Sequence, residues 1–159
     1  MQETITDIAY SNLKFDGWRQ SQKSITFAGG TTNAIGDYDG TGNPFSIFSV
    51  TGDVIAKVLA VCTTNLAGGG ATLSVGVVGT SQSAKIIAVT TATDIIAGEI
   101  WHDATPDSFV EASSVMVENV IANGANIIGT VGTANITSGV MKFICLWKPL
   151  SSDGGVEAA

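Results

Sequence analysis

The chain has 159 residues, of which 45% are hydrophobic and only 13% are charged, and its formal net charge is −7. This length is that of one ordinary domain, which can bury a sizeable core without support from a metal ion or a disulfide. The mean hydropathy is +0.34, but the sequence has no run of 18 apolar residues, which argues against a membrane-spanning helix. An acidic chain without a basic stripe also repels phosphate backbones, so we expect neither a nucleic-acid nor a membrane partner. The surplus of apolar residues is then expected at a subunit interface.

Residues 1–23 differ from the rest of the chain because apolar and polar residues do not alternate there. They combine aromatic side chains with basic ones, and we interpret them as an N-terminal arm. The arm either reaches onto a neighbouring subunit or folds back over its own domain. Its candidate interface residues are Phe15, Trp18 and Arg19. The segment has neither the basic nor the apolar region of a secretion signal, so we expect synthesis in a cytoplasm.

Alternation with a period of two dominates the chain after the arm. It is clearest over 71–78, where Leu73, Val75 and Val77 alternate with small or polar residues, as in a strand with one buried face. No long segment with a period of 3.6 residues intervenes. The predicted strands are 24–28, 45–50, 53–63, 71–78, 85–91, 114–122, 126–133 and 140–147.

These eight short strands are separated by turn sequences, so they predict an all-β fold. The expected architecture is an antiparallel β-sandwich of jelly-roll or related Greek-key topology, with the arm outside the sandwich. We place the sandwich domain at 24–150. Residues 151–159 are small and polar, which predicts a flexible C-terminal tail.

Two of the predicted strands, 53–63 and 140–147, are apolar on both faces. The opposite sheet of a sandwich covers only one face, so the second needs a loop, the N-terminal segment or another subunit. Cys62 and Cys145 lie within these runs. In a chain that folds in a reducing cytoplasm, we expect both to be buried thiols.

The stretch AIGDYDGTGNPFSIFSV, residues 34–50, looks like the opening of a calcium-binding loop, with Asp37 and Asp39 at its first and third positions. The position that requires a bidentate Glu is occupied by Phe48, and a strand follows where that motif needs a helix. We therefore interpret both carboxylates as turn residues that accept backbone N–H groups. The alternative is a non-helical calcium site on Asp37 and Asp39.

The one histidine lies in EIWHDATPD, residues 99–107, which is the richest polar cluster of the chain. Catalysis would need a nucleophile and a base within reach of each other, but the chain has no G-x-S-x-G motif. We predict an ordered loop around Pro106, in which Asp and Thr side chains cap their own backbone and Trp101 packs beneath. We expect no enzymatic activity and no cofactor.

Three longer stretches are VTGDVIAKVLAVCTTNLAGGGATLSVGV, TTATDIIAGEIWHDATPD and GTANITSGVMKFICLWKPLSSDG, which together extend over about residues 50–154. As a set, they resemble a group of small proteins encoded among the virion structural genes of tailed bacteriophages. The resemblance implies a virion structural protein, and specifically a head decoration or cement protein that binds the major capsid protein on the capsid surface. It carries over no catalytic residue and does not extend to the first 49 residues.

Low charge, apolar strand faces and an aromatic arm are independently typical of a subunit that packs against neighbours in a symmetric lattice. Capsid lattices offer three-fold positions, so we expect a homotrimer. The alternative is a tail, fibre or adhesin-type sandwich that binds host-surface glycans. For that function Trp18, Trp101 and Trp147 could provide a platform for sugar stacking.

Overall fold

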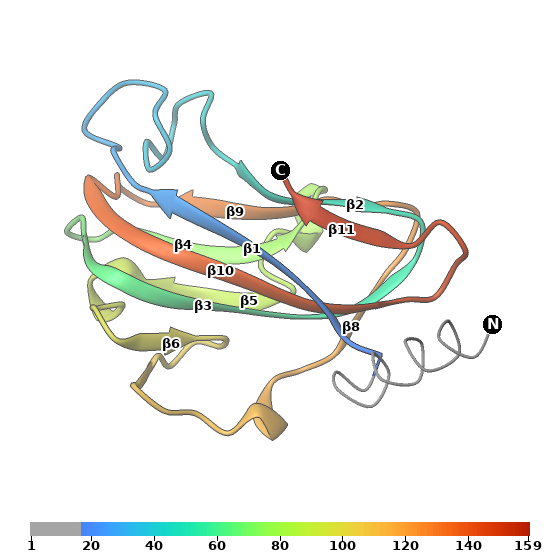
Figure 1. Cartoon of the computed structure of the whole chain (residues 1–159). Helices are drawn as coiled ribbons and strands as arrows, with labels where there is room; N and C mark the ends of the chain where they lie inside the picture. Colours follow the sequence, from blue (N-terminus) through green and yellow to red (C-terminus); the bar gives the residue numbers. More distant parts are fainter. Residues whose placement is uncertain (1–16) are drawn as a thin grey trace.

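The computed structural model describes residues 17–159, and Figure 1 shows the two layers of strands into which they fold. Both layers are antiparallel sheets, one of six strands and one of five. The described part of the chain contains three short 3-10 segments and no α-helix. The predicted all-β antiparallel sandwich is therefore confirmed, whereas the jelly-roll topology stays a prediction. Within 17–159, no helix has the length and apolar character needed to cross a membrane.

The first sheet has the strand order β1-β10-β3-β6-β7, and β8 also pairs with β3. Its strands are β1 (Arg19–Thr26), β3 (Val54–Ala67), β6 (Glu99–Trp101), β7 (Asp107–Ser108), β8 (Asn119–Ile121) and β10 (Ser138–Pro149). The second sheet has the order β11-β2-β9-β4-β5. Its strands are β2 (Phe45–Thr51), β4 (Thr72–Val77), β5 (Ile87–Thr91), β9 (Ile127–Gly132) and β11 (Gly155–Ala158). The 3-10 segments are η1 (Thr80–Gln82), η2 (Ala92–Asp94) and η3 (Ser113–Val115).

The core lies between the sheets and follows from the alternation along the strands. In β3 every second residue from Val54 to Cys62 is buried, and the residues between them are half-buried. Aromatic rings from both sheets meet edge to face at the centre, a geometry that ring quadrupoles favour. The ring centroids of Phe45 and Phe143 lie 6.4 Å apart, and those of Phe143 and Trp101 also lie 6.4 Å apart.

The outer face of β3 and β10 is the second apolar face that the sequence predicted. Its apolar members are half-buried: Ile55, Leu59, Val61, Val140, Ile144 and Leu146. Lys57, Lys142 and Lys148 lie among them on the same face. We call these nine residues the outer face. Long lysine side chains can cover apolar surface with their stems, and the ammonium groups of Lys57 and Lys148 lie over the ring of Trp18.

The two cysteines are buried and free. Cys62 is paired in register with Met141, and Cys145 lies four residues further along β10. Four residues of strand span about 13 Å, whereas a disulfide needs Cα atoms within roughly 7 Å of each other. The two thiols therefore cannot form a bridge while β3 and β10 remain paired.

The predicted boundary of the N-terminal arm is wrong at its C-terminal end. Residues 19–23 belong to β1, which is paired with β10 from Arg19 opposite Trp147 to Thr26 opposite Val140. Ladder hydrogen bonds to a long neighbouring strand outweigh the weak apolar pattern of this polar edge strand. Any arm is thus confined to the residues before Trp18, and Phe15 lies outside the described residues.

The predicted flexible tail is also wrong over residues 155–158, because β11 pairs with β2 from Gly155 opposite Thr51 to Ala158 opposite Phe48. Val156 is buried in the core. Two side chains of β1, which belongs to the first sheet, also donate hydrogen bonds to the C-terminal residues of the chain. Ser21 Oγ donates to the Val156 carbonyl at 2.6 Å, and Lys23 Nζ donates to the carbonyl oxygen of Ala159 at 2.5 Å.

The predicted strand 114–122 is shorter in the structure, where only Asn119–Ile121 forms β8. The preceding residues contain η3 and pair with no strand. The valines that suggested this strand, Val115, Val117 and Val120, are exposed. Val115 and Val117 lie on the segment before β8, and Val120 is the exposed residue of β8 itself.

Candidate functional site

The candidate site is the segment that connects β6 to β8, residues 102–118, together with the adjacent start of β1. Both β6 and β8 pair with β3, so the segment leaves the sheet at one position along β3 and returns at another. Figure 1 shows it extending away from the two layers. Within it, β7 returns onto β6, with Glu99 opposite Ser108 and Ile100 opposite Asp107. We call residues 102–118 the connecting segment.

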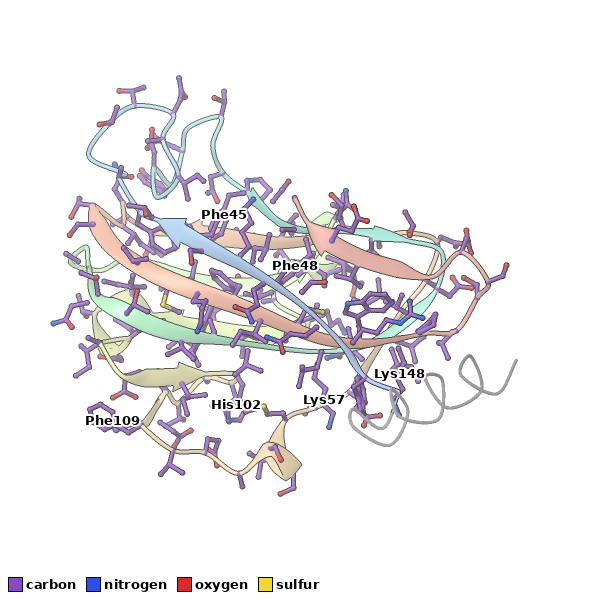
Figure 2. All side chains as sticks on the ribbon, in the orientation of Figure 1. Phe45, Phe48, Lys57, His102, Phe109 and Lys148 are labelled. Carbon is purple, nitrogen blue, oxygen red and sulfur yellow. The ribbon has the colours of Figure 1, made fainter. Side chains whose placement is uncertain are left out.

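A polar cluster lies at the base of the connecting segment, and its central member is His102 (Figure 2). The imidazole side chain is only 5% exposed. Its Nε2 lies 3.4 Å from Glu111 Oε2 and 3.8 Å from Asp107 Oδ2. Its Nδ1 lies 4.0 Å from Asp103 Oδ2. Three carboxyl groups therefore surround one buried imidazole.

Two carboxyl groups of this cluster, those of Asp107 and Glu111, shift each other's pKa. The pKa of Asp107 is raised, chiefly because its carboxyl is hydrogen-bonded to that of Glu111. The pKa of Glu111 is lowered, first because its carboxylate accepts a hydrogen bond from the Ala112 backbone N–H and then because of the Asp107 carboxyl. The backbone nitrogen of Ala112 lies 2.5 Å from Glu111 Oε1. Of the two, Asp107 is thus the carboxyl that holds a proton more readily.

The ordered loop predicted around Pro106 is confirmed. The Thr105 backbone N–H donates to Asp103 Oδ1 at 2.7 Å, which is the local cap expected of an Asp in a turn. Trp101 is fully buried beneath, and its Nε1 donates to Thr90 Oγ1 at 2.9 Å. Sequence reasoning missed the approach of Glu111, because only the β6–β7 pairing brings that residue back to His102.

The outer part of the connecting segment carries exposed apolar side chains. Phe109 is 81% exposed and Val110 is 79% exposed, and Val117 and Val120 are each 70% exposed. Phe109 also has a φ of 66°, a left-handed conformation that bulky residues rarely adopt. Its aromatic ring contacts the Cα side of Gly98, where an added Cβ would lie 2.3 Å from Phe109 Cε1. The loop thus presents Phe109 to solvent in a defined orientation.

Trp18, which directly precedes β1, makes cation–π contacts with two lysines of the outer face. Lys57 Nζ lies 5.2 Å and Lys148 Nζ 4.7 Å from the ring centroid of Trp18. Lys57 Nζ also lies 3.5 Å from Glu118 Oε1 at the end of the connecting segment. The Arg19 guanidinium lies 5.1 Å from the ring centroid of Trp147. Trp18 and Arg19, predicted as interface residues, therefore both contact their own domain.

In the loop around Asp37 and Asp39, a side chain accepts a hydrogen bond from the backbone of the same loop. Asp37 is buried, and its Oδ2 accepts the Asn33 backbone N–H at 2.7 Å, which confirms the interpretation of this carboxylate as a turn residue. Asp39 is exposed. Across residues 17–159, the one group of His, Cys, Asp and Glu side chains placed to share a metal ion is His102, Asp103 and Asp107.

The tryptophans do not form a common surface. Trp101 is fully buried, Trp147 is 7% exposed and Trp18 is half-buried under two lysines. A sugar-stacking platform built from all three is thus inconsistent with the structure. Comparison of the chain with family models, with curated proteins and with solved structures finds no match.

Proposed function

We propose that this chain is a virion structural protein of a tailed bacteriophage, a head decoration protein that binds the major capsid protein and stabilises the shell. It acts as a homotrimer on the capsid surface and without catalysis. The proposal starts from the resemblance of residues 50–154 to proteins encoded among virion structural genes. The observation that carries it further is the exposed apolar surface of the connecting segment.

Of the ten large apolar residues that are exposed within residues 17–159, five lie on or directly beside the connecting segment, whereas the other five are scattered over the molecule. Phe109, Val110, Val115 and Val117 belong to the connecting segment, and Val120 follows them in β8. Burying such side chains against a partner contributes about 25 cal/mol for each Å² removed from water. A surface of this kind favours association with another protein over binding of a small polar ligand.

The outer face supports contacts between copies of the chain. It carries three lysines on β3 and β10 and no carboxylate on either strand's outward positions, although the whole chain has 14 acidic and 7 basic residues. An outer face that is locally positive complements the acidic remainder of another copy. Such complementarity fixes orientation and speeds association, whereas buried apolar contacts supply most of the affinity.

Avidity and mass action explain how such a trimer would attach to a capsid shell and stabilise it. A trimer touches several capsid subunits at once, so weak individual contacts combine as avidity. A protein that binds the assembled shell and not the dissociated subunits stabilises that shell by mass action. Low exposure of tryptophan and the absence of a shared aromatic platform within 17–159 favour this function over a glycan-binding module.

The copy number of the chain in purified particles tests the proposal. A head decoration protein is expected in hundreds of copies per particle, and sedimentation of the isolated protein is expected to give three times the chain mass. A few copies per particle, located on the tail, would contradict the head assignment and support the tail or fibre alternative. A monomer that binds host-surface glycans would contradict the whole proposal.

A further inference from the structure

We propose that the outer face of one copy is the docking surface for residues 1–16 of a second copy of the chain. The inference rests on the proposed function in one respect, because both require that copies associate, but it does not depend on the capsid. It assigns an occupant to the half-buried face of β3 and β10 that carries three lysines. That occupant is the acidic and apolar segment that precedes Gly17.

The apolar surface of the outer face continues over neighbouring strands. Residues directly opposite each other on paired antiparallel strands point to the same side of a sheet. Leu59 of β3 lies opposite Ile144 of β10, and Val61 lies opposite Ile100 of β6. Val120 of β8 continues the surface beside the start of β3. One side of the first sheet is therefore apolar over β10, β3, β6 and β8.

The strand β1 borders this apolar surface with polar side chains. Gln20, Gln22 and Ser24 are exposed and lie opposite outward residues of β10. The second sheet packs against the inward residues of β3 and β10, which belong to the core, so it does not cover the outward ones. An apolar centre with a polar border is the usual composition of a protein–protein interface.

The charges of the outer face and of residues 1–16 are complementary. The outer face carries three of the seven basic residues of the chain, and β1, β3 and β10 contain no acidic residue. Lys142 forms no ion pair within residues 17–159. Residues 1–16 contain three acidic residues and one basic residue, together with the large apolar residues Ile5, Ile8, Tyr10, Leu13 and Phe15. Both the charge and the apolar side chains of this segment therefore match the face.

The described chain begins at one end of the outer face. The ring of Trp18 lies over Lys57 and Lys148, and a Cβ added to Gly17 would lie 3.7 Å from Lys148 Cε. Each copy thus covers the Lys148 end of the face with its own tryptophan. Lys142 is six residues away along β10, which corresponds to about 20 Å.

The direction of β1 favours a second copy over the chain's own face. β1 runs from its pairing with Trp147 to its pairing with Val140, so it follows the outer face forward from Trp18. A chain that continued backward along the same line would leave the face at the Lys148 end. Sixteen residues extend to at most about 55 Å, which is more than the length of the face on a neighbouring copy.

The proposed contact joins two different surfaces, a donated segment and a receiving face. Each copy donates residues 1–16 to one neighbour and receives the segment of another. Contacts of this heterologous kind close into a ring when the rotation between copies closes. They therefore give the proposed trimer one identical contact for each copy.

Photocrosslinking of the full-length chain tests the docking contact. A photoreactive phenylalanine derivative replaces Ile8, and chains labelled with light and with heavy isotopes are refolded together before irradiation. We expect cross-linked peptides that join residues 1–16 of one isotope to β3 or β10 of the other. Cross-links within one isotope only would show that the segment covers its own copy, and cross-links to the second sheet or to the connecting segment would show another docking surface. Either result would overturn the proposal.

Charge reversal in the full-length chain provides an independent measurement. Lys142→Glu is expected to weaken self-association in sedimentation at least about tenfold, and adding Glu3→Lys and Asp7→Lys to that variant is expected to restore part of it. Lys85→Glu is the matched control, because Lys85 is an exposed lysine before β5 of the second sheet, and it is expected to associate as the natural chain does. A monomeric natural chain, or association unchanged by Lys142→Glu, would also overturn the proposal.

Failure of the docking contact is distinguishable from failure of the proposed function. A chain that binds undecorated phage heads without these cross-links would contradict the docking contact alone. A chain that forms the cross-links but binds no heads would contradict the proposed function and support the docking contact.

Discussion

The ammonium group of Lys57 lies 5.2 Å from the centre of the Trp18 ring. The same ammonium lies 3.5 Å from Glu118 Oε1, so one lysine connects the start of β1 with the end of the connecting segment. Cation–π contacts at partly exposed sites contribute about 0.5–1 kcal/mol. Trp18, near the start of the described chain, is therefore connected through Lys57 to Glu118 at the end of the connecting segment.

The effect of N-terminal truncation is expected to depend sharply on where the chain is cut. Deleting residues 1–16 leaves β1 whole, so the sandwich is expected to stay folded while oligomerisation or capsid attachment weakens. Deleting 1–23 also removes residues 19–23 of the eight-residue strand β1 and exposes the edge of β10. That change is expected to destabilise the domain by several kcal/mol, which urea denaturation of the two truncated chains would measure. Equal stability of the two would contradict the pairing of β1.

The contact between Gly129 and Phe45 predicts a site that does not tolerate a larger residue. A Cβ at Gly129 in β9 would lie 2.1 Å from Phe45 Cζ, inside the closely packed core. Gly129→Ala is therefore expected to destabilise the domain by about 1–3 kcal/mol, because the buried ring must shift. Gly69→Ala is the control, since nothing lies within 4 Å of an added Cβ there. Urea denaturation would show the difference, and an equally small effect at both positions would contradict the packing.

The buried thiol of Cys145 predicts a loss of stability at alkaline pH. Burial raises the pKa of Cys145 to about 12 from an ordinary value of 9.0. Because the folded-state pKa is the higher one, this contribution is fully present below pH 9 and is lost as the pH rises toward 12. The difference between the two values corresponds to on the order of 4 kcal/mol.

Denaturation from pH 8 to 11 should therefore show a steeper decline for the natural chain than for Cys145→Ala, which has no thiol to ionise at this position. Parallel declines would show that the thiol does not contribute. The same burial predicts that Cys145 reacts with thiol reagents only slowly in the folded protein at pH 8.

Calcium is expected to have no stabilising effect through Asp37 and Asp39, because the Asp37 carboxylate already accepts the Asn33 backbone N–H. Replacing Asp37 by Ala leaves that N–H without its partner, which is expected to cost about 1–3 kcal/mol. Melting of the metal-free chain with and without millimolar calcium checks this. A calcium-dependent rise that disappears in the Asp37→Ala, Asp39→Ala double variant would contradict it.

The strands with regular alternation could be predicted from the sequence. Leu73, Val75 and Val77 predicted β4, and the apolar runs of β3 and β10 predicted strands with a second face to cover. These signals are local, because they arise from the period of two along a single strand. Eight of the eleven strands were predicted in this way, with boundaries that differ by a few residues.

The strands and contacts that were missed depend on distant parts of the chain. β11 was predicted as a tail because its short sequence carries little apolar signal, and only its pairing with β2 orders it. The start of β1 was assigned to an arm for the same reason. The approach of Glu111 to His102 follows from the β6–β7 turn, and no spacing in the sequence indicates it. Val115 and Val117 have the composition of a strand, but only Asn119–Ile121 pairs with β3 to form β8.

The most direct test of the proposed function is co-sedimentation of the purified chain with undecorated phage heads. The natural chain is expected to bind and to raise the temperature at which the heads disrupt, whereas a Phe109→Ser, Val117→Ser variant is expected to bind at least about tenfold more weakly. Val78→Ser, Val89→Ser is the matched control, because both valines are exposed but belong to the other sheet's side of the molecule. Equal binding by all three chains, or no binding by the natural chain, would contradict the account.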